Sequence, residues 1–254
     1  MKTLPRFFAP PENVSANQVV IRGSDATHIR TVLRLKPGDD IHVLDGKGGR
    51  FRVRLCAVRP KEAAGQIVSR ERIQTESPLA IKLGQAIIKG NKFDSVVRKS
   101  VELGVHSIVP LHTERTVVKV SPEDQEKKTR RWRKIALEAS KQCGRSEVPA
   151  VETSILSVDQ FCAGCRDFEL KLAFWEDEER ARLKDAADLK LPDGAPPVRG
   201  VACLIGPEGG FTQTEIETAR ARGFQCVTLG PRKLRSETAT IAVLSIIQSF
   251  WGDL

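Results

Sequence analysis

Three cationic side chains stand close together near the C-terminal end of the chain. Arg232, Lys233 and Arg235 follow a Gly-Pro pair and precede an apolar segment that begins near Ser236. Cations so closely spaced can contact the phosphates of a nucleic acid or favour an anion that develops during a reaction. The alternative is ordinary surface charge at the start of a helix.

Two Gly-Pro turns follow apolar runs in this part of the chain. LIGP at 204–207 and TLGP at 228–231 each end a segment typical of a buried strand and lead into a helix. Open parallel sheets bind ligands at the carboxyl ends of their strands. The two turns therefore predict a narrow slot lined by backbone groups, suited to an adenine edge and a ribose diol. The alternative is a pair of ordinary strand-to-helix turns.

The residues of the first turn limit what this slot can hold. A phosphate-binding P-loop needs a Lys and a hydroxyl beside its second Gly, but here Phe211 follows Gly210. Glu208 would also repel a phosphate, whereas it would tolerate a cation such as a sulfonium. Thr212 and Glu215 have the spacing of a capping box, so side chains already satisfy some donors of the next helix.

Composition and charge narrow the class of protein. The 254-residue chain has a formal net charge of +9, and residues 1–73 hold 14 Lys and Arg against 7 Asp and Glu. This asymmetry favours nucleic acid as partner, with a solvated basic surface as the alternative. We expect no membrane span and no signal peptide, because both need a longer apolar run. Six scattered cysteines, with one CxxC at 162 and 165, indicate reduced thiols in the cytoplasm and no metal site.

Residues 1–73 predict a small β-barrel with a basic face. Short β-branched or alternating segments are separated by KPGDD and GKGG turns, and residues 24–35 predict an amphipathic helix. In FRVRL, Arg52 and Arg54 alternate with apolar residues, so both should lie on the side turned away from the core. Further arginines available for this face are Arg6, Arg30, Arg34 and Arg50.

From residue 74 to 254, alternating strands and helices predict a mostly parallel sheet covered on both faces. The predicted strands are 79–87, 106–112, 168–176, 201–207 and 226–231, and the main predicted helices are 93–104, 122–144, 176–189 and the one from Ser236. We interpret the mixed charges of 122–144 as a solvated helix face. The terminal helix is so apolar that it must be buried, in the fold or against a second subunit.

Several of these motifs resemble those of a known family. LIGPEGGFTQTEIETA, followed by TLGPRKLRSETATIAVLSIIQ, resembles the C-terminal signature of the RsmE family, bacterial enzymes that methylate N3 of a uridine in 16S ribosomal RNA. VRKSVELGVHSIVPLHTERTVV and KIALEASKQCGRSEVP resemble its middle section. RFFAP and HIRTVLRLKPGD resemble its N-terminal RNA-binding domain. The similarity covers nearly the whole chain.

The resemblance implies an α/β protein with a PUA-like β-barrel at 1–73 and a SPOUT-type methyltransferase domain with a C-terminal trefoil knot at 74–254. It further implies S-adenosylmethionine as methyl donor, and a cytoplasmic homodimer that uses the terminal helix. The partner would be 16S ribosomal RNA or the assembled small subunit. Carried over by motif, the cofactor slot consists of Leu204, Ile205, Gly206, Glu208, Gly210, Thr228, Leu229, Gly230 and Leu234, with Phe174, Trp175 and Glu176 as a third wall.

The chemistry implied by the resemblance requires help at N3 of uridine. N3 carries an imide proton and is a poor nucleophile, so we expect Arg235 to stabilise the N3 anion by facing the carbonyl oxygens of the base. The base must be unstacked from folded RNA, whose phosphates Arg6, Arg34 and Arg232 would contact. Two alternatives remain open. One is ribose 2′-O-methylation by the same type of fold, and the other is a non-catalytic RNA-binding factor in ribosome assembly.

Overall fold

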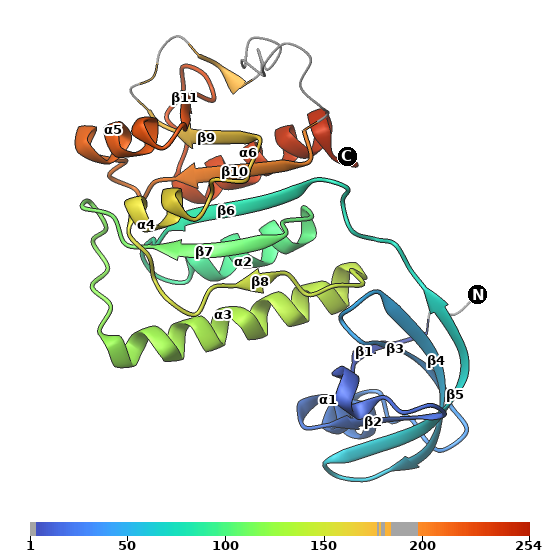
Figure 1. Cartoon of the computed structure of the whole chain (residues 1–254). Helices are drawn as coiled ribbons and strands as arrows, with labels where there is room; N and C mark the ends of the chain where they lie inside the picture. Colours follow the sequence, from blue (N-terminus) through green and yellow to red (C-terminus); the bar gives the residue numbers. More distant parts are fainter. Residues whose placement is uncertain (1–3, 177, 179–180, 184–197) are drawn as a thin grey trace. The chain divides into compact units, whose positions relative to one another are not determined.

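The structure divides into two compact units (Figure 1). The computed structural model describes residues 4–176, 178, 181–183 and 198–254. The first unit consists of the chain up to Glu76 together with Glu138–Val148, and the second of Ser77–Leu137 with Pro149–Leu254. The predicted helix at 176–189 falls largely outside the described residues. The predicted division of roles at residue 73 stays a prediction.

A curled five-stranded sheet forms most of the first unit. Its order is β1-β3-β4-β5-β2, and only the β1–β3 pair is parallel. The strands are β1 (Arg6–Phe8), β2 (Gln18–Arg22), β3 (Asp40–Leu44), β4 (Gly49–Val58) and β5 (Glu62–Arg72). The short helices are η1 (Pro11–Asn13), α1 (Ser24–Thr27) and the π-helical η2 (His28–Val32). The helix predicted at 24–35, between the first two predicted strands, corresponds to α1 and η2 between β2 and β3, and the short β1 was not predicted.

The alternation in β4 explains which face of this sheet is buried. Phe51 and Val53 lie in the core, whereas Arg52 and Arg54 are exposed, as predicted. Both guanidinium groups donate hydrogen bonds to Asp40, and those from Arg54 and then Arg52 hold the pKa of this carboxyl below its ordinary value. The carboxylate of Asp40 therefore neutralises part of the positive charge of these two arginines.

A parallel six-stranded sheet forms the centre of the second unit, in the order β11-β9-β10-β6-β7-β8. Its strands are β6 (Ala80–Ala86), β7 (Ser107–Leu111), β8 (Ala150–Val151), β9 (Leu170–Phe174), β10 (Gly200–Ile205) and β11 (Gln225–Val227). The central β10 is buried along its whole length, as expected for a strand covered on both faces. The chain thus returns to place β10 between β6 and β9, which confirms the predicted parallel sheet.

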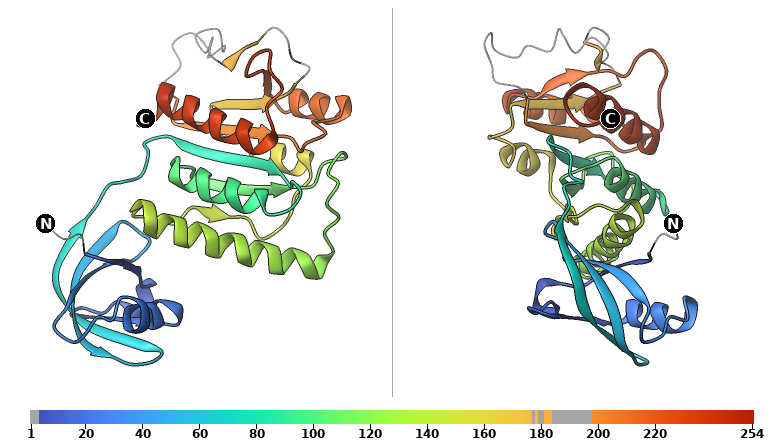
Figure 2. Two further views of the ribbon diagram at one scale, coloured as in Figure 1. Left: turned by 180° about the vertical axis from the view of Figure 1, so that it is seen from behind. Right: turned by 90° about the vertical axis from the view of Figure 1, so that its right-hand side faces the viewer.

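Helices cover both faces of this sheet (Figure 2). On one face lie α2 (Lys92–Glu102) and α6 (Ser236–Trp251), which pack on each other, and on the other α4 (Val158–Ala163) and α5 (Gln213–Ala221). The long α3 (Pro122–Cys143) belongs to this unit as far as Leu137. Gly84 in β6 has a packing reason, because a Cβ there would lie 2.6 Å from Cζ of Phe161 on α4.

The six cysteines differ in their exposure to solvent. Cys56 and Cys143 are exposed free thiols, whereas the CxxC pair, Cys162 and Cys165, is buried in the core with the remaining two. Burial raises the pKa of Cys162 to about 12 and that of Cys165 to about 11. In the described ranges, no helix has the length and apolar character that crossing a bilayer requires.

Candidate functional site

A cavity of about 560 Å³ lies at the carboxyl ends of β9, β10 and β11, beside the first turn of α6. Its size is in the range of pockets that hold a small molecule or cofactor. The lining residues are Phe174, Trp175, Glu176, Glu178, Arg182, Ile205, Gly206, Pro207, Glu208, Gly210, Phe211, Val227, Thr228, Leu229, Gly230, Pro231, Arg232, Lys233, Leu234, Arg235, Ser236 and Ala239. The two Gly-Pro turns thus lie at one cavity, as the sequence predicted.

One predicted slot residue lies elsewhere. Leu204 is fully buried in the core cluster that includes Phe211 and Ile216, on the face of the sheet that α4 and α5 cover. Successive side chains of a strand point to opposite faces, so Leu204 points into this core while Ile205 contributes to the cavity lining. The side chain of Leu204 therefore supports the site from behind, and the remaining predicted slot residues line the cavity.

The turn after β10 is held tightly by its own backbone and by neighbouring loops. Gly210 N donates to Pro207 O at 3.0 Å, and Gly210 has a φ of +69°. A side chain at Gly210 would be strained, and its Cβ would lie 2.8 Å from Oε1 of Glu176. Oε1 of Glu208 accepts a hydrogen bond from Lys89 N at 3.1 Å, so this carboxylate also fixes the loop after β6. The capping box of Thr212 and Glu215 is present as predicted.

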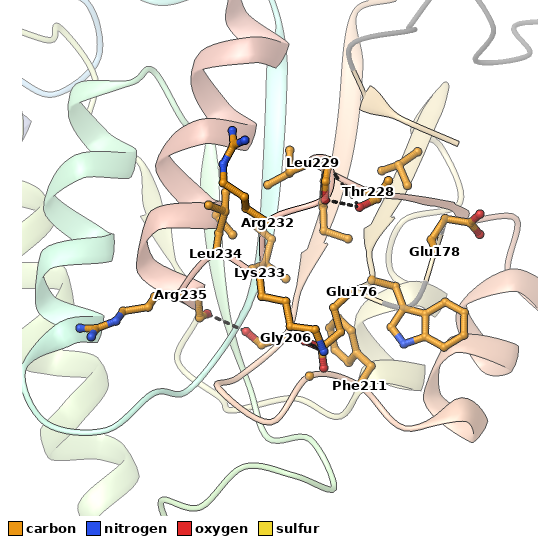
Figure 3. Close-up of a pocket in the computed structure, with 18 of the residues that line it drawn as sticks. Glu176, Glu178, Gly206, Phe211, Thr228, Leu229, Arg232, Lys233, Leu234 and Arg235 are labelled. Atoms are coloured by element: carbon orange, nitrogen blue, oxygen red, sulfur yellow. Dashed lines mark hydrogen bonds and ion pairs between the residues drawn. The ribbon is translucent and has the colours of Figure 1, made fainter. Parts of the chain in front are cut away.

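The turn after β11 forms the opposite wall (Figure 3). Thr228 is paired on both sides of its backbone, with N–H donating to Ala181 O and C=O accepting from Leu183 N. Gly230 has a φ of +114° and open space around its Cα, so a glycine is needed there for conformation. Lys233 reaches across the cavity, and its Nζ lies 3.5 Å from Oε2 of Glu176. This ion pair joins the second turn to the loop after β9.

A buried polar network ties the two turns together, and sequence reasoning missed it. Ser236 Oγ donates to Gly206 O at 2.6 Å and accepts from Nε2 of Gln85 at 3.0 Å. Oε1 of Gln85 lies 2.5 Å from Oγ1 of Thr240, one helical turn after Ser236. Gln85, Ser236 and Thr240 are all buried. The available signal was a lone amide in the apolar segment 79–87 and two hydroxyl residues four positions apart in an apolar helix.

The charged side chains next to the first turn of α6 differ in whether they form ion pairs. Burial opposes ionisation of Glu237, but hydrogen bonds from its own backbone N–H and from Lys92 hold its pKa below the ordinary value. The lowered pKa makes this carboxylate a weak proton acceptor at neutral pH, and therefore poorly suited as a general base. Arg232 and Arg235 form no ion pair with any residue that the structure describes, and the guanidinium of Arg235 extends away from the other labelled lining residues (Figure 3). Arg235 is thus available for an anionic ligand.

Two arginines predicted to contact RNA lie in the first unit. Arg34 is exposed and follows η2 with a φ of +53°, the sole non-glycine residue with positive φ in the described ranges. Arg6, in β1, is half-buried, and its Nη1 would lie 2.6 Å from a Cβ at Gly144. Arg34 is accordingly the more accessible of the two cations.

Two protein-family models match consecutive parts of the chain. A family model for an RNA methyltransferase domain matches residues 75–248, and one for an RNA methyltransferase PUA domain matches 21–68. Ribosomal RNA small subunit methyltransferase E of Bacillus subtilis is 31% identical over 89% of this chain and 88% of its own length. The chain belongs to the ribosomal RNA small subunit methyltransferase E family. The Synechocystis member is 33% identical over 96% of this chain and 77% of its own length.

Solved structures similar to this member of the methyltransferase E family contain the methyl donor. A methyltransferase from Legionella pneumophila in complex with S-adenosylmethionine is 35% identical, with a TM-score of 0.88 and complete coverage of both chains (100% and 100%). The methyltransferase E of Neisseria gonorrhoeae, bound to S-adenosylmethionine, is 36% identical, with a TM-score of 0.86 over 98% of this chain and 99% of that one. The expected fold, a PUA-like unit and a SPOUT-type methyltransferase unit, is therefore shown as an architecture.

Proposed function

We propose that this chain transfers a methyl group from S-adenosylmethionine to N3 of a uridine in 16S ribosomal RNA. The observation that carries the proposal is the cavity enclosed by the two Gly-Pro turns at the carboxyl ends of β9, β10 and β11, in a member of the methyltransferase E family. Open parallel α/β sheets generally bind their ligands at the carboxyl ends of neighbouring strands.

The residues present fit S-adenosylmethionine. The cavity combines backbone-lined turns with apolar walls and the carboxylates of Glu176 and Glu208, which suits a cationic ligand with an adenine and a ribose. Trp175 contributes an apolar wall of the cavity, and the guanidinium of Arg220 lies over its ring, 5.5 Å from the ring centroid. We assign cofactor binding to Phe174, Trp175, Glu176, Ile205, Gly206, Glu208, Gly210, Thr228, Leu229, Gly230 and Leu234, with Leu204 in support.

The chain's own groups would lower the barrier at N3. S-adenosylmethionine supplies an electrophilic methyl group when bound. Arg235, without an ion-pair partner in the described residues, would face the uracil carbonyl oxygens and stabilise the anion that forms when the N3 proton passes to solvent. The turns that Ser236 and Gln85 hold together would exclude water and fix the orientation of the reacting groups.

The proposal extends to the RNA partner and to assembly. Residues 1–73 would bind 16S ribosomal RNA or the assembled small subunit, with Arg6, Arg34 and Arg232 contacting phosphates. Residues 74–254 would form the methyltransferase domain, whose C-terminal segment would be threaded as a trefoil knot. We further propose a cytoplasmic homodimer that buries the apolar side chains α6 exposes, Ile241 and Phe250.

The test is a calorimetric titration with S-adenosylmethionine of the wild type and the Gly210→Trp variant. An indole at this position would project into the cavity, so we expect binding to be lost. Gly223→Trp is the matched control, because Gly223 also has a positive φ, of +84°, but is exposed and outside the lining. Equal binding by the wild type and Gly210→Trp would reject the assigned slot.

A second measurement separates the proposed reaction from its alternatives. Methylated 16S ribosomal RNA, digested to nucleosides, should contain 3-methyluridine. A 2′-O-methylated nucleoside would favour the ribose chemistry instead. Binding of RNA without any methyl transfer would favour the non-catalytic assembly factor.

A further inference from the structure

Four cations form a row on the solvent side of α3. Lys127, Arg130, Arg131 and Lys134 are spaced at i, i+3, i+4 and i+7, which places them on one face of a helix. They are all exposed and span about 10 Å along the helix axis. We name these four residues the α3 basic stripe.

The packing of α3 explains why this face is turned to solvent. Thr129, Trp132 and Ala136 are buried on the opposite side of the helix. The ring of Trp132 lies 4.2 Å from that of Phe93 on α2, and its Nε1 donates to Oδ1 of Asp94 at 3.2 Å. A rotation of α3 would break this ring contact and its hydrogen bond, so the stripe stays exposed.

Intramolecular carboxylates neutralise the stripe only in part. Arg131 forms an ion pair with Asp94, and Arg130 pairs with Glu126. The second pair is 78% and 76% exposed, so it contributes little and can exchange for another anion. Lys127 and Lys134 have no ion-pair partner among the described residues. Helical spacing puts Glu123 and Glu138 one turn beyond the two ends, so these acids bound the stripe.

The start of α2 links the stripe to the first turn of α6, which lies beside the cavity. Arg131 contacts both Asn91 and Asp94, and the neighbouring Lys92 lies 3.1 Å from Glu237 in the first turn of α6. Arg235 directly precedes that turn. In the view from behind, α2 lies between α6 and the portion of α3 up to Leu137 (Figure 2). A polyanion bound at the cavity can therefore continue over α2 onto the stripe.

We propose that the α3 basic stripe binds the phosphate backbone of the RNA that flanks the methylated base. This inference rests on the proposed function, and it adds a second RNA contact to the methyltransferase unit, beside the one proposed for Arg232. Phosphates fit better than a protein partner, because α3 carries none of the large exposed apolar side chains found in the described residues. The charges of residues 122–144, interpreted from sequence as a solvated face, would thus contact the substrate.

The experiment measures binding of 16S ribosomal RNA and of isolated small ribosomal subunits as a function of salt. The test variant combines Lys127→Ala, Arg130→Ala and Lys134→Ala, and retains Arg131 because it pairs with Asp94. We expect binding at least about tenfold weaker, and a slope of log K against log salt that is shallower by roughly 2 to 3 units, since each lost phosphate contact removes nearly one unit.

A matched control removes the same amount of charge elsewhere in the unit. It combines Arg166→Ala, Arg199→Ala and Arg222→Ala, exposed cations after α4, before β10 and at the end of α5. A further variant, Lys127→Arg with Arg130→Lys and Lys134→Arg, keeps the charge and should restore binding. Calorimetry with S-adenosylmethionine should give wild-type affinity for every variant.

Each outcome bears on the inference. Equal weakening in the test and control variants would mean that net charge alone acts, and no weakening in either would mean that the stripe does not touch RNA. Either result overturns the inference but leaves the proposed methylation intact. If the wild type bound neither 16S ribosomal RNA nor the small ribosomal subunit, the proposed function would be rejected, and the inference with it.

Discussion

Replacement of Ser236 by Ala should destabilise the site, because it removes the side-chain hydrogen bond that joins the start of α6 to the turn after β10. The Ser236 hydroxyl donates to Gly206 O at 2.6 Å and accepts from Gln85 at 3.0 Å. Gly206 lies in the turn after β10, whereas Ser236 begins α6 after the second turn. The substitution removes only one oxygen, so its effect reports on hydrogen bonding rather than on packing.

The expected loss of unfolding free energy depends on the buried polar groups that the substitution leaves without a partner. Ser236 is 6% exposed and Gln85 fully buried, so the lost bonds leave a carbonyl and part of an amide without good access to water. An unpaired buried polar group costs about 1–3 kcal/mol. Gln85 Nε2 keeps its bond to Ala86 O, which places the expected loss near the middle, at about 2 kcal/mol. For a chain of this size, that corresponds to a melting temperature lower by roughly 4–8 °C.

Ser100→Ala provides the control for this measurement. Ser100 is likewise a buried serine in a helix, but its hydroxyl has no hydrogen-bond partner in the described ranges. Its removal should change stability little or raise it, because no bond is lost. Thermal unfolding of both variants, followed by calorimetric titration with S-adenosylmethionine, measures stability and site geometry separately. A melting temperature of Ser236→Ala no lower than that of Ser100→Ala would refute the link between the turns.

Three further predictions concern catalysis, pH and thiol reactivity. Arg235→Ala should lower kcat by about 10²–10³ and leave S-adenosylmethionine affinity near that of the wild type, as single-turnover assays and calorimetry would measure. Burial opposes ionisation of Glu76, yet Arg145 and nearby hydrogen bonds hold its pKa below the ordinary value, so the stability it contributes is present above about pH 4.5 and is lost as pH falls through the lowered value. Acid titration of unfolding should therefore be flatter in Glu76→Gln, and an unchanged profile would contradict this. Iodoacetamide at neutral pH should alkylate Cys56 and Cys143 alone in the folded protein, as mass spectrometry of peptides would show.

Local sequence was sufficient for features that depend on neighbouring residues. The capping box of Thr212 and Glu215, the start of α6 at Ser236 and the outward direction of Arg52 follow from short-range spacing, and all are present in the structure. The Gly-Pro turns were recognisable for the same reason, because glycine and proline act on their own φ angles. The alternation of strands and helices likewise predicted the parallel sheet.

Tertiary structure alone decided how these pieces meet. Strand order β11-β9-β10-β6 brings the two turns to one cavity, and it arises from pairing between strands far apart in the chain. The same pairing sets which face each side chain takes, so Leu204 enters the core and Ile205 lines the cavity. Gln85 reaches Ser236 across 151 positions, a contact that no local pattern specifies. Sequence determined the turns and their residue types, whereas long-range packing determined their distance, because burial free energy depends on the whole assembled core.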